Sequence, residues 1–228
     1  MSAIASSVRT PNHSSTPLAA RFAALQAERE ASWPPAQLAA NLHQRELLAS
    51  AHDPADHPAR GAPVAPFTLV GADGVAITDA DVLARGPAVL VFYRFGTCPA
   101  CTIALPYYQE TLWPRLSAAG ITLVAVSAQT PVDTGIALRG GLTFPLASDP
   151  DYTLARRLGI TFFPEAQPPV APGQDWIGAT LGTDSYEMVQ PAVVILNADG
   201  TLRQLIVSPD WLDRPEADEI LAHLPEAG

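Results

Sequence analysis

The sequence contains no lysine: all 13 basic residues are arginine, set against 23 acidic residues, and the formal net charge is −10. The absence of lysine excludes Schiff-base chemistry and a phosphate-loop lysine. Nucleic-acid affinity comes largely from basic groups that displace counterions from phosphates, and anionic lipids likewise attract clusters of basic residues. We therefore expect neither nucleic acid nor a membrane surface as a partner.

Long apolar runs are also absent. A continuous run such as Ala88–Tyr93 has the length of a strand, whereas a membrane span needs about 20 residues. The N-terminus is rich in Ser and Thr and lacks the apolar core of about 7–15 residues that a secretory signal carries. The sequence therefore predicts a disordered tail over residues 1–15 and a cytoplasmic protein. With 228 residues, the chain is long enough to bury a core without disulfides.

Cysteine is scarce, and the two that occur, Cys98 and Cys101, form a C-x-x-C motif. In a reducing compartment such a pair is more often redox-active or metal-binding than structural. The sequence predicts no site for an organic cofactor.

The pattern of apolar residues divides the chain into two parts. Leu18, Phe22 and Leu25 follow one another at helical spacing, and a second apolar series follows Pro34-Pro35, which predicts a helical extension over residues 16–58. From residue 59 to residue 228, short strands alternate with helices. Strands are expected at 67–70, 75–77, 88–93, 121–126, 144–147, 192–196 and 202–207, and helices at 79–85, 98–119, 131–138, 149–158 and 216–224.

This alternation predicts an α/β fold with a mixed central sheet. Parallel pairing places helices on both faces of the sheet, and the late pair of strands adds an antiparallel edge. The N-terminal helical hairpin would precede this domain.

The C-x-x-C motif follows a buried strand and opens a helix. Unpaired N–H groups and the helix dipole stabilise an anion there, and they can lower a thiol pKa to about 3.5–7.5. We therefore expect an exposed Cys98 that attacks and a more buried Cys101 that resolves a mixed disulfide. Arg94 is a candidate for a positive charge near the sulfur, and Thr97 for a hydrogen bond to it.

Strand, C-x-x-C and helix, with Pro106 five residues after the second cysteine, resemble the active site of a thioredoxin fold. Pro191 stands where that fold has a cis-proline facing the disulfide. The wider pattern, over roughly residues 60–224, resembles the peroxiredoxin-like alkyl hydroperoxide reductase/thiol-specific antioxidant (AhpC/TSA) family. The segments that carry this resemblance are 62–69 (APVAPFTL), 92–101 (FYRFGTCPAC), 126–131 (VSAQTP), 144–150 (FPLASDP) and 190–192 (QPA).

The resemblance implies a thioredoxin-like fold, in its peroxiredoxin-like variant, and thiol-dependent antioxidant activity. Cys98 would attack a peroxide oxygen or a disulfide sulfur, Cys101 would close the disulfide, and a dithiol protein or a small thiol would reduce it. Pro191, if cis, would keep a neighbouring backbone group available to an extended substrate. The stretch 160–190 is a candidate for shaping substrate access or a homodimer contact.

Several alternatives stay open. Val91 and Phe95 stand where a typical peroxiredoxin has Pro and Thr, so a disulfide reductase without peroxidase activity is the main alternative. A thioredoxin fold that is redox-inactive and serves as an interaction module is the second. His52 and His57 could complete a zinc site with the two cysteines, although they lie far ahead of them in the chain. A structural disulfide is disfavoured because the loop it would close is very short.

Overall fold

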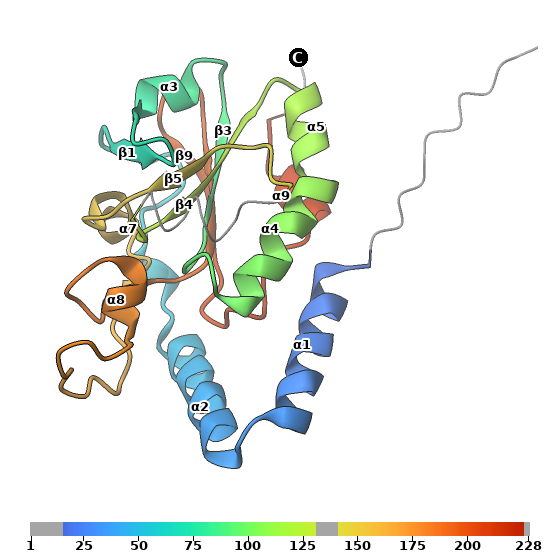
Figure 1. Ribbon diagram of the computed structural model, residues 1–228. Coiled ribbons are helices and arrows are strands. Elements are labelled where there is room, and N and C mark those ends of the chain that lie inside the picture. Colours follow the sequence, from blue (N-terminus) through green and yellow to red (C-terminus); the bar gives the residue numbers. More distant parts are fainter. Residues whose placement is uncertain (1–15, 131–140, 226–228) are drawn as a thin grey trace, which may run out of the picture.

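The computed structural model describes residues 16–130 and 141–225 (Figure 1). The predicted tail and the helix predicted at 131–138 lie outside these residues. The helices are α1 (Leu18–Ser32), α2 (Pro35–Ala51), α3 (Asp79–Leu83), α4 (Pro99–Thr111), α5 (Trp113–Ala118), α7 (Thr153–Arg157), α8 (Ile177–Leu181) and α9 (Ala217–Ala222), with a 3-10 turn η1 (Pro54–Asp56). Within the described part of the chain, none of them is long and apolar enough to cross a membrane.

The predicted mixed α/β sheet is confirmed. Its seven strands lie in the order β2-β1-β5-β4-β3-β8-β9; the three central strands β5, β4 and β3 are parallel to one another, and every other pair of neighbours is antiparallel. The strands are β1 (Thr68–Gly71), β2 (Ala76–Thr78), β3 (Ala88–Phe92), β4 (Thr122–Ser127), β5 (Leu146–Ser148), β8 (Ala192–Leu196) and β9 (Leu202–Val207). A separate pair joins β6 (Thr161–Phe162) to β7 (Met188–Val189).

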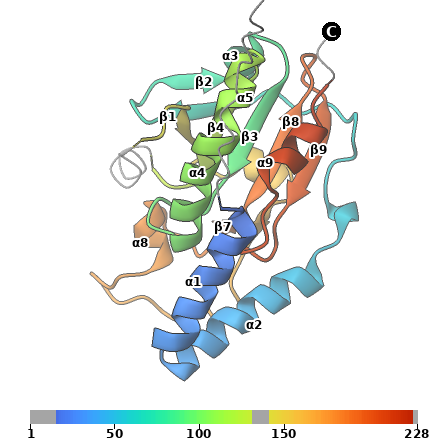
Figure 2. The ribbon, with the colours of Figure 1, turned by 90° about the vertical axis from the view of Figure 1, so that its right-hand side faces the viewer.

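The side chains of β3 contribute alternately to two hydrophobic cores, because successive side chains of a strand point to opposite faces of the sheet. Val89 and Val91 pack on the face covered by α4, α5 and α9, whereas Ala88, Leu90 and Phe92 pack on the face covered by α3 and α7. Figures 1 and 2 show this three-layer arrangement. Both cysteines belong to the first core.

The single helix predicted over 98–119 is wrong: the chain forms two helices that break at Leu112. The cause is Pro114, which occupies the first turn of α5. Proline has no N–H to donate, and its ring crowds the carbonyl four residues earlier, so Pro114 favours a new helix start at this point, whereas Pro106 lies inside α4 without ending it.

The helical hairpin, defined here as α1 and α2, packs against the sheet domain. Helix α1 lies along α4 (Figure 2), and its Leu18 and Phe22 are buried in the same core as the cysteines. The amide of Ala19 donates to Glu216 (3.0 Å) at the N-terminal end of α9. The guanidinium of Arg45, on α2, donates to both carboxylate oxygens of Asp210 (2.7 Å each).

Candidate active site

The C-x-x-C motif lies at the start of α4, as the sequence predicts. Cys98 is the N-cap residue in an extended conformation, and Pro99 takes the first helical position, where a missing N–H costs no hydrogen bond. Two buried residues at the end of β4 and just after it hold the loop before the motif. The side chain of Gln129 accepts from the amide of Gly96 (2.7 Å), and Ser127 Oγ donates to the carbonyl of Arg94 (3.0 Å).

The expected exposure of Cys98 is wrong. Only 2% of Cys98 is accessible to solvent, and Cys101 is fully buried. Leu18 and Phe22 of the helical hairpin belong to the same buried cluster as the two cysteines. Sequence reasoning placed the motif at a helix start but did not foresee that another helix would cover it.

The negative charge of the reduced pair is stabilised on Cys101. Burial raises the pKa of Cys101, but hydrogen bonds from Cys98, the Arg214 guanidinium and the Arg94 amide outweigh it and hold that pKa well below its ordinary value. The two nitrogen donors each lie 3.4 Å from the Cys101 sulfur. The hydrogen bond to Cys101, together with burial and the negative charge on Cys101, raises the pKa of Cys98 well above its ordinary value. In the reduced pair, burial and the contact with Cys101 thus oppose the lowering of the Cys98 pKa that the helix start predicts.

Arg94 contacts a sulfur through its backbone rather than through the guanidinium that the sequence offered as a charge near it. Its amide donates to Cys101, whereas its guanidinium lies 4.2 Å from the centre of the Trp211 ring and donates to Met188 Sδ (3.4 Å). The charge of this guanidinium also favours a negative charge on Cys98.

Arg214 is the site residue that sequence reasoning missed. It lies between β9 and α9, is only 7% exposed, and is fixed by a hydrogen bond from its Nε to the carbonyl of Trp211 (3.0 Å). Arg214 and Cys101 are 113 positions apart in the chain, so no local sequence pattern could have identified Arg214.

Thr97 and Pro191 do not take the places predicted for them. Thr97 is exposed, and among the described contacts its hydroxyl makes no hydrogen bond to either sulfur. Pro191 borders a small cavity that Arg214 also lines, but no peptide bond of the described residues is cis. Its carbonyl accepts from the amide of Ser208 (2.7 Å), and the Gln190 amide donates to Ile160 (2.8 Å). These two backbone groups are therefore engaged within the protein rather than available to a substrate.

The histidines of the zinc alternative lie apart from the sulfurs. His52 and His57 contact each other (3.4 Å between ring nitrogens), and His57 also lies 3.1 Å from the carbonyl of Leu158. Within residues 16–130 and 141–225, no group of three or more His, Cys, Asp or Glu side chains is arranged to hold a metal ion.

Comparison with known proteins identifies relatives over the sheet domain. The model of the AhpC/TSA family matches residues 60–205. Two provisionally named peroxiredoxins, from two strains of Mycobacterium tuberculosis, are each 38% identical over 87 residues, which are 37% of this chain and 54% of theirs. The match thus spans about half the length of these curated relatives.

Solved structures with the same fold include three peroxiredoxin-type proteins. Peroxidoxin BcpB from Mycobacterium tuberculosis is 23% identical, with a TM-score of 0.56 over 73% of this chain and 96% of its own. A peroxiredoxin-like protein from Aquifex aeolicus is 15% identical, with a TM-score of 0.55 over 73% of this chain and 85% of its own. AhpC from Enterococcus faecalis is 18% identical, with a TM-score of 0.55 over 72% and 88%. They confirm the thioredoxin-like fold in its peroxiredoxin-like variant.

The boundaries of the family match divide the site. Both cysteines and Arg94 lie inside residues 60–205, whereas Arg214 and the whole helical hairpin lie outside.

Proposed function

Since the chain belongs to the AhpC/TSA family, we propose that it is a thiol oxidoreductase that reduces hydroperoxides with the Cys98–Cys101 dithiol. The observation that carries this proposal is the direct contact of two buried sulfurs at a helix start, with the Arg214 guanidinium hydrogen-bonded to one of them. A thiolate is the nucleophile in peroxide and disulfide chemistry, and positive charge and N–H donors increase its population at neutral pH.

The reaction needs the electron pair on Cys98. A proton passes from Cys98 to Cys101, and the Cys98 thiolate then attacks the terminal oxygen of the hydroperoxide. The O–O bond breaks, Cys98 becomes a sulfenic acid, and the alkoxide takes the proton that Cys101 holds and leaves as an alcohol. Cys101, now a thiolate, attacks the Cys98 sulfur, hydroxide leaves and takes up a proton from solvent to become water, and the Cys98–Cys101 disulfide forms. The substrate gains two electrons, which the dithiol loses.

The burial of the pair favours a small oxidant. A protein disulfide must bring its own sulfur into contact with Cys98, of which only 2% is exposed, whereas a small hydroperoxide needs only a narrow opening. The oxidised pair would be reduced by a dithiol protein or a small thiol in the reducing cytoplasm, where such an exchange is thermodynamically favourable.

The test is the rate at which the fully reduced protein loses its alkylatable thiols after mixing with hydrogen peroxide, and separately with a small disulfide. Intact mass reports the loss directly. We expect peroxide to oxidise the pair much faster than it oxidises free cysteine. Cys98→Ser should abolish this reaction, by a factor on the order of 10³ or more, because it removes the nucleophile.

Cys101→Ser is the matched variant, because it changes the other sulfur and retains the nucleophile. It should react once and stop at the sulfenic acid or, with a disulfide reagent, at a mixed disulfide on Cys98. Slow peroxide oxidation with fast disulfide exchange would favour a thioredoxin-type reductase. Failure of both reagents would favour a redox-inactive interaction module, and equal partial losses in the two variants would contradict the separate roles of the sulfurs.

A further inference from the structure

The small cavity that Arg214 and Pro191 border has the size of one water molecule. Its walls come from β3, β8 and α4 and from the segment that joins β9 to α9. The space that the centre of a water molecule can occupy there is about 10 Å³. A buried water needs about 10–15 Å³ on this measure. A hydroperoxide has at least two heavy atoms, so the cavity is too small to be the substrate site.

The guanidinium of Arg214 has acceptors for two of its three nitrogens. Its Nε donates to the carbonyl of Trp211 (3.0 Å), and its Nη2 donates to the Cys101 sulfur (3.4 Å). Its Nη1 is buried and has no hydrogen-bond acceptor among the described residues, and Arg214 as a whole is only 7% exposed. A buried donor without an acceptor is costly and rare in native proteins, and a bound water or ion commonly accounts for one.

The cavity offers further polar groups to a bound water. The hydroxyl of Tyr108, a lining residue, donates to the carbonyl of Pro215 (2.8 Å), so its oxygen can still accept a hydrogen bond. Ser208 also lines the cavity and carries a second hydroxyl. A buried water ordinarily makes about three hydrogen bonds, and a cavity with polar groups takes up water where an apolar one stays dry. Arg214 Nη1 and these two hydroxyls are enough for one water.

The negative charge on Cys101 favours a neutral ligand over an anion. Cys101 already accepts from Nη2 of the same guanidinium, so an anion at Nη1 would lie close to the thiolate and would be repelled by it. An anion would also lose its own hydration on entering the cavity. A water molecule accepts the same hydrogen bond without either cost.

We propose that this cavity is a binding site for a single water molecule, which accepts a hydrogen bond from Arg214 Nη1 and donates to a lining hydroxyl. All three nitrogens of the guanidinium then have acceptors, and the side chain is held on both edges while Nη2 contacts Cys101. The water takes no part in the redox steps. The inference therefore does not depend on which oxidant the dithiol reduces.

The direct test is a crystal structure of the reduced full chain, grown from a solution in which bromide replaces chloride. We expect electron density about 2.7–3.2 Å from Arg214 Nη1, without an anomalous bromine signal. An anomalous peak at that position would overturn the inference, because it would show that the site takes an anion. A cavity without density would overturn it as well.

Val193→Ile tests the same site in solution, because it adds one carbon to a residue that lines the cavity. Val193 lies on β8 and is only 2% exposed. Filling a dry cavity stabilises a protein, whereas displacement of a bound water leaves Nη1 without an acceptor. We therefore expect the melting temperature of the full chain to fall by about 3 °C or more. A rise in the melting temperature would contradict the inference.

Arg214→Met separates displacement of the water from overpacking, because it removes the donor. In that background Val193→Ile should leave the melting temperature unchanged or raise it. An equal fall in both backgrounds would show that the added carbon overpacks the core, and it would overturn the inference.

Val194→Ile is the matched control. Val194 is the next residue of β8 and packs in the core on the other face of the sheet. Its change should have the same effect with Arg214 and with Met at that position. If Arg214→Met does not fold, the crystal structure alone decides. Neither measurement uses a substrate, so this inference and the proposed function fail separately.

Discussion

Two regions of this molecule are built by different kinds of contact. The family-matched body, residues 60–205, is held by apolar side chains that alternate between the two faces of its sheet. The surrounding segments, which are the helical hairpin and residues 208–224, are attached partly through charged groups. These are the Arg45–Asp210 pair, the Glu216 contacts and the buried Arg214.

This difference separates two parts of the chemistry. The body supplies both sulfurs and holds them at the start of α4, an arrangement that fits dithiol chemistry in itself. The surrounding segments supply the cover that buries Cys98 and the Arg214 guanidinium that holds the charge on Cys101. A thioredoxin-like body can thus keep its motif while the segments outside the family match adjust the access and the charge of the sulfurs.

Arg214→Met tests most directly whether the charge on Cys101 depends on the surrounding segments. Arg214 lowers the pKa of Cys101 through its charge and its hydrogen bond, so its removal should raise the pH midpoint of thiolate formation by about one unit or more. A hydrogen bond to a charged group contributes about 1.5–3 kcal/mol, which accounts for a shift of this size. The titration of thiolate absorbance in the reduced protein measures it.

Arg157→Met is the control for Arg214→Met. Arg157 belongs to the body and donates to the carbonyl of Pro66 (2.8 Å) at the surface, so its loss should leave the titration unchanged. If the titrations of Arg214→Met and wild type coincide, the charge of the pair does not depend on the surrounding segments.

A smaller effect is expected from Arg45→Met, which breaks the pair that holds α2 to Asp210. The pair is partly buried and bidentate, so its loss should cost about 1 kcal/mol of docking free energy. Transient opening of the hairpin should then become about fivefold more frequent. Iodoacetamide should modify Cys98 faster in Arg45→Met than in the wild-type protein, by a similar factor.

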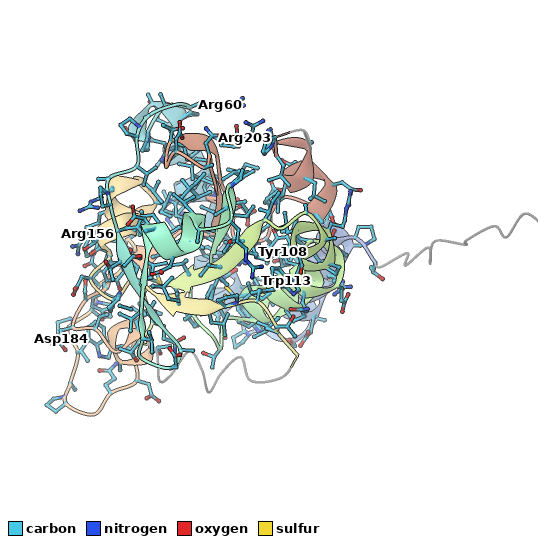
Figure 3. All side chains as sticks on the ribbon, turned by 90° about the horizontal axis from the view of Figure 1, so that it is seen from above. Arg60, Tyr108, Trp113, Arg156, Asp184 and Arg203 are labelled. Atoms are coloured by element: carbon cyan, nitrogen blue, oxygen red, sulfur yellow. The ribbon has the colours of Figure 1, made fainter. Side chains whose placement is uncertain are left out.

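Arg156→Met provides the matching change inside the body. Arg156 forms a bidentate pair with Glu187, as Arg45 does with Asp210. Figure 3 shows Arg156 at the left edge of the molecule, away from Tyr108 and Trp113, which pack in the core that contains the cysteines. Its removal should leave the alkylation of Cys98 unchanged. Equal acceleration in the two variants would show that the reagent reaches Cys98 by general unfolding rather than by opening of the hairpin.

Sequence reasoning succeeded where the controlling pattern is local. The apolar runs of β3, β4 and β8 are buried on both faces and were found within one or two residues of their ends. The position of Cys98 at a helix start followed from Pro99 and the preceding strand. The break at Leu112 has a local signal in Pro114, in the first turn of α5, although Pro106 lies inside α4 without ending it.

The rest depends on segments distant in the chain. The buried cluster of Cys98 includes residues of α1, which lies along α4, and the hydrogen bond to Cys101 comes from Arg214, 113 positions further along the chain. The spacing of apolar residues along the sequence predicts neither of these long-range contacts. Arg29, which lies on α1 and is only 5% exposed, is an intermediate case: its place on the stripe of Leu18, Phe22 and Leu25 is visible in the sequence, but a charge there would ordinarily mark the end of a buried face.

The smallest expected effect is the response of hairpin docking to acid. Burial raises the pKa of Asp210, but hydrogen bonds from Arg45 and from the amide of Leu212 outweigh it, and the net pKa lies below its ordinary value. A carboxyl whose pKa is lower in the folded state stabilises that state above its unfolded pKa, near 4, and this contribution is lost as pH falls through the folded value. Hydrogen-exchange protection of the α1 and α2 amides, corrected for the intrinsic rate, should therefore be constant from neutral pH to about pH 4 and decrease below it.

Asp210→Asn isolates this contribution from other acids that titrate in the same range, such as Glu216. It keeps the size of the side chain and removes its charge, so hairpin protection at neutral pH should already fall toward the acid value of the wild type. The remaining decrease below pH 4 should be correspondingly smaller. Glu187→Gln makes the equivalent change in the body and should leave the protection of α1 and α2 as it is, because Glu187 pairs with Arg156 away from the hairpin. A full acid response retained by Asp210→Asn would mean that Glu216 and the apolar stripe of α1, rather than the Arg45–Asp210 pair, hold the cover over the sulfurs.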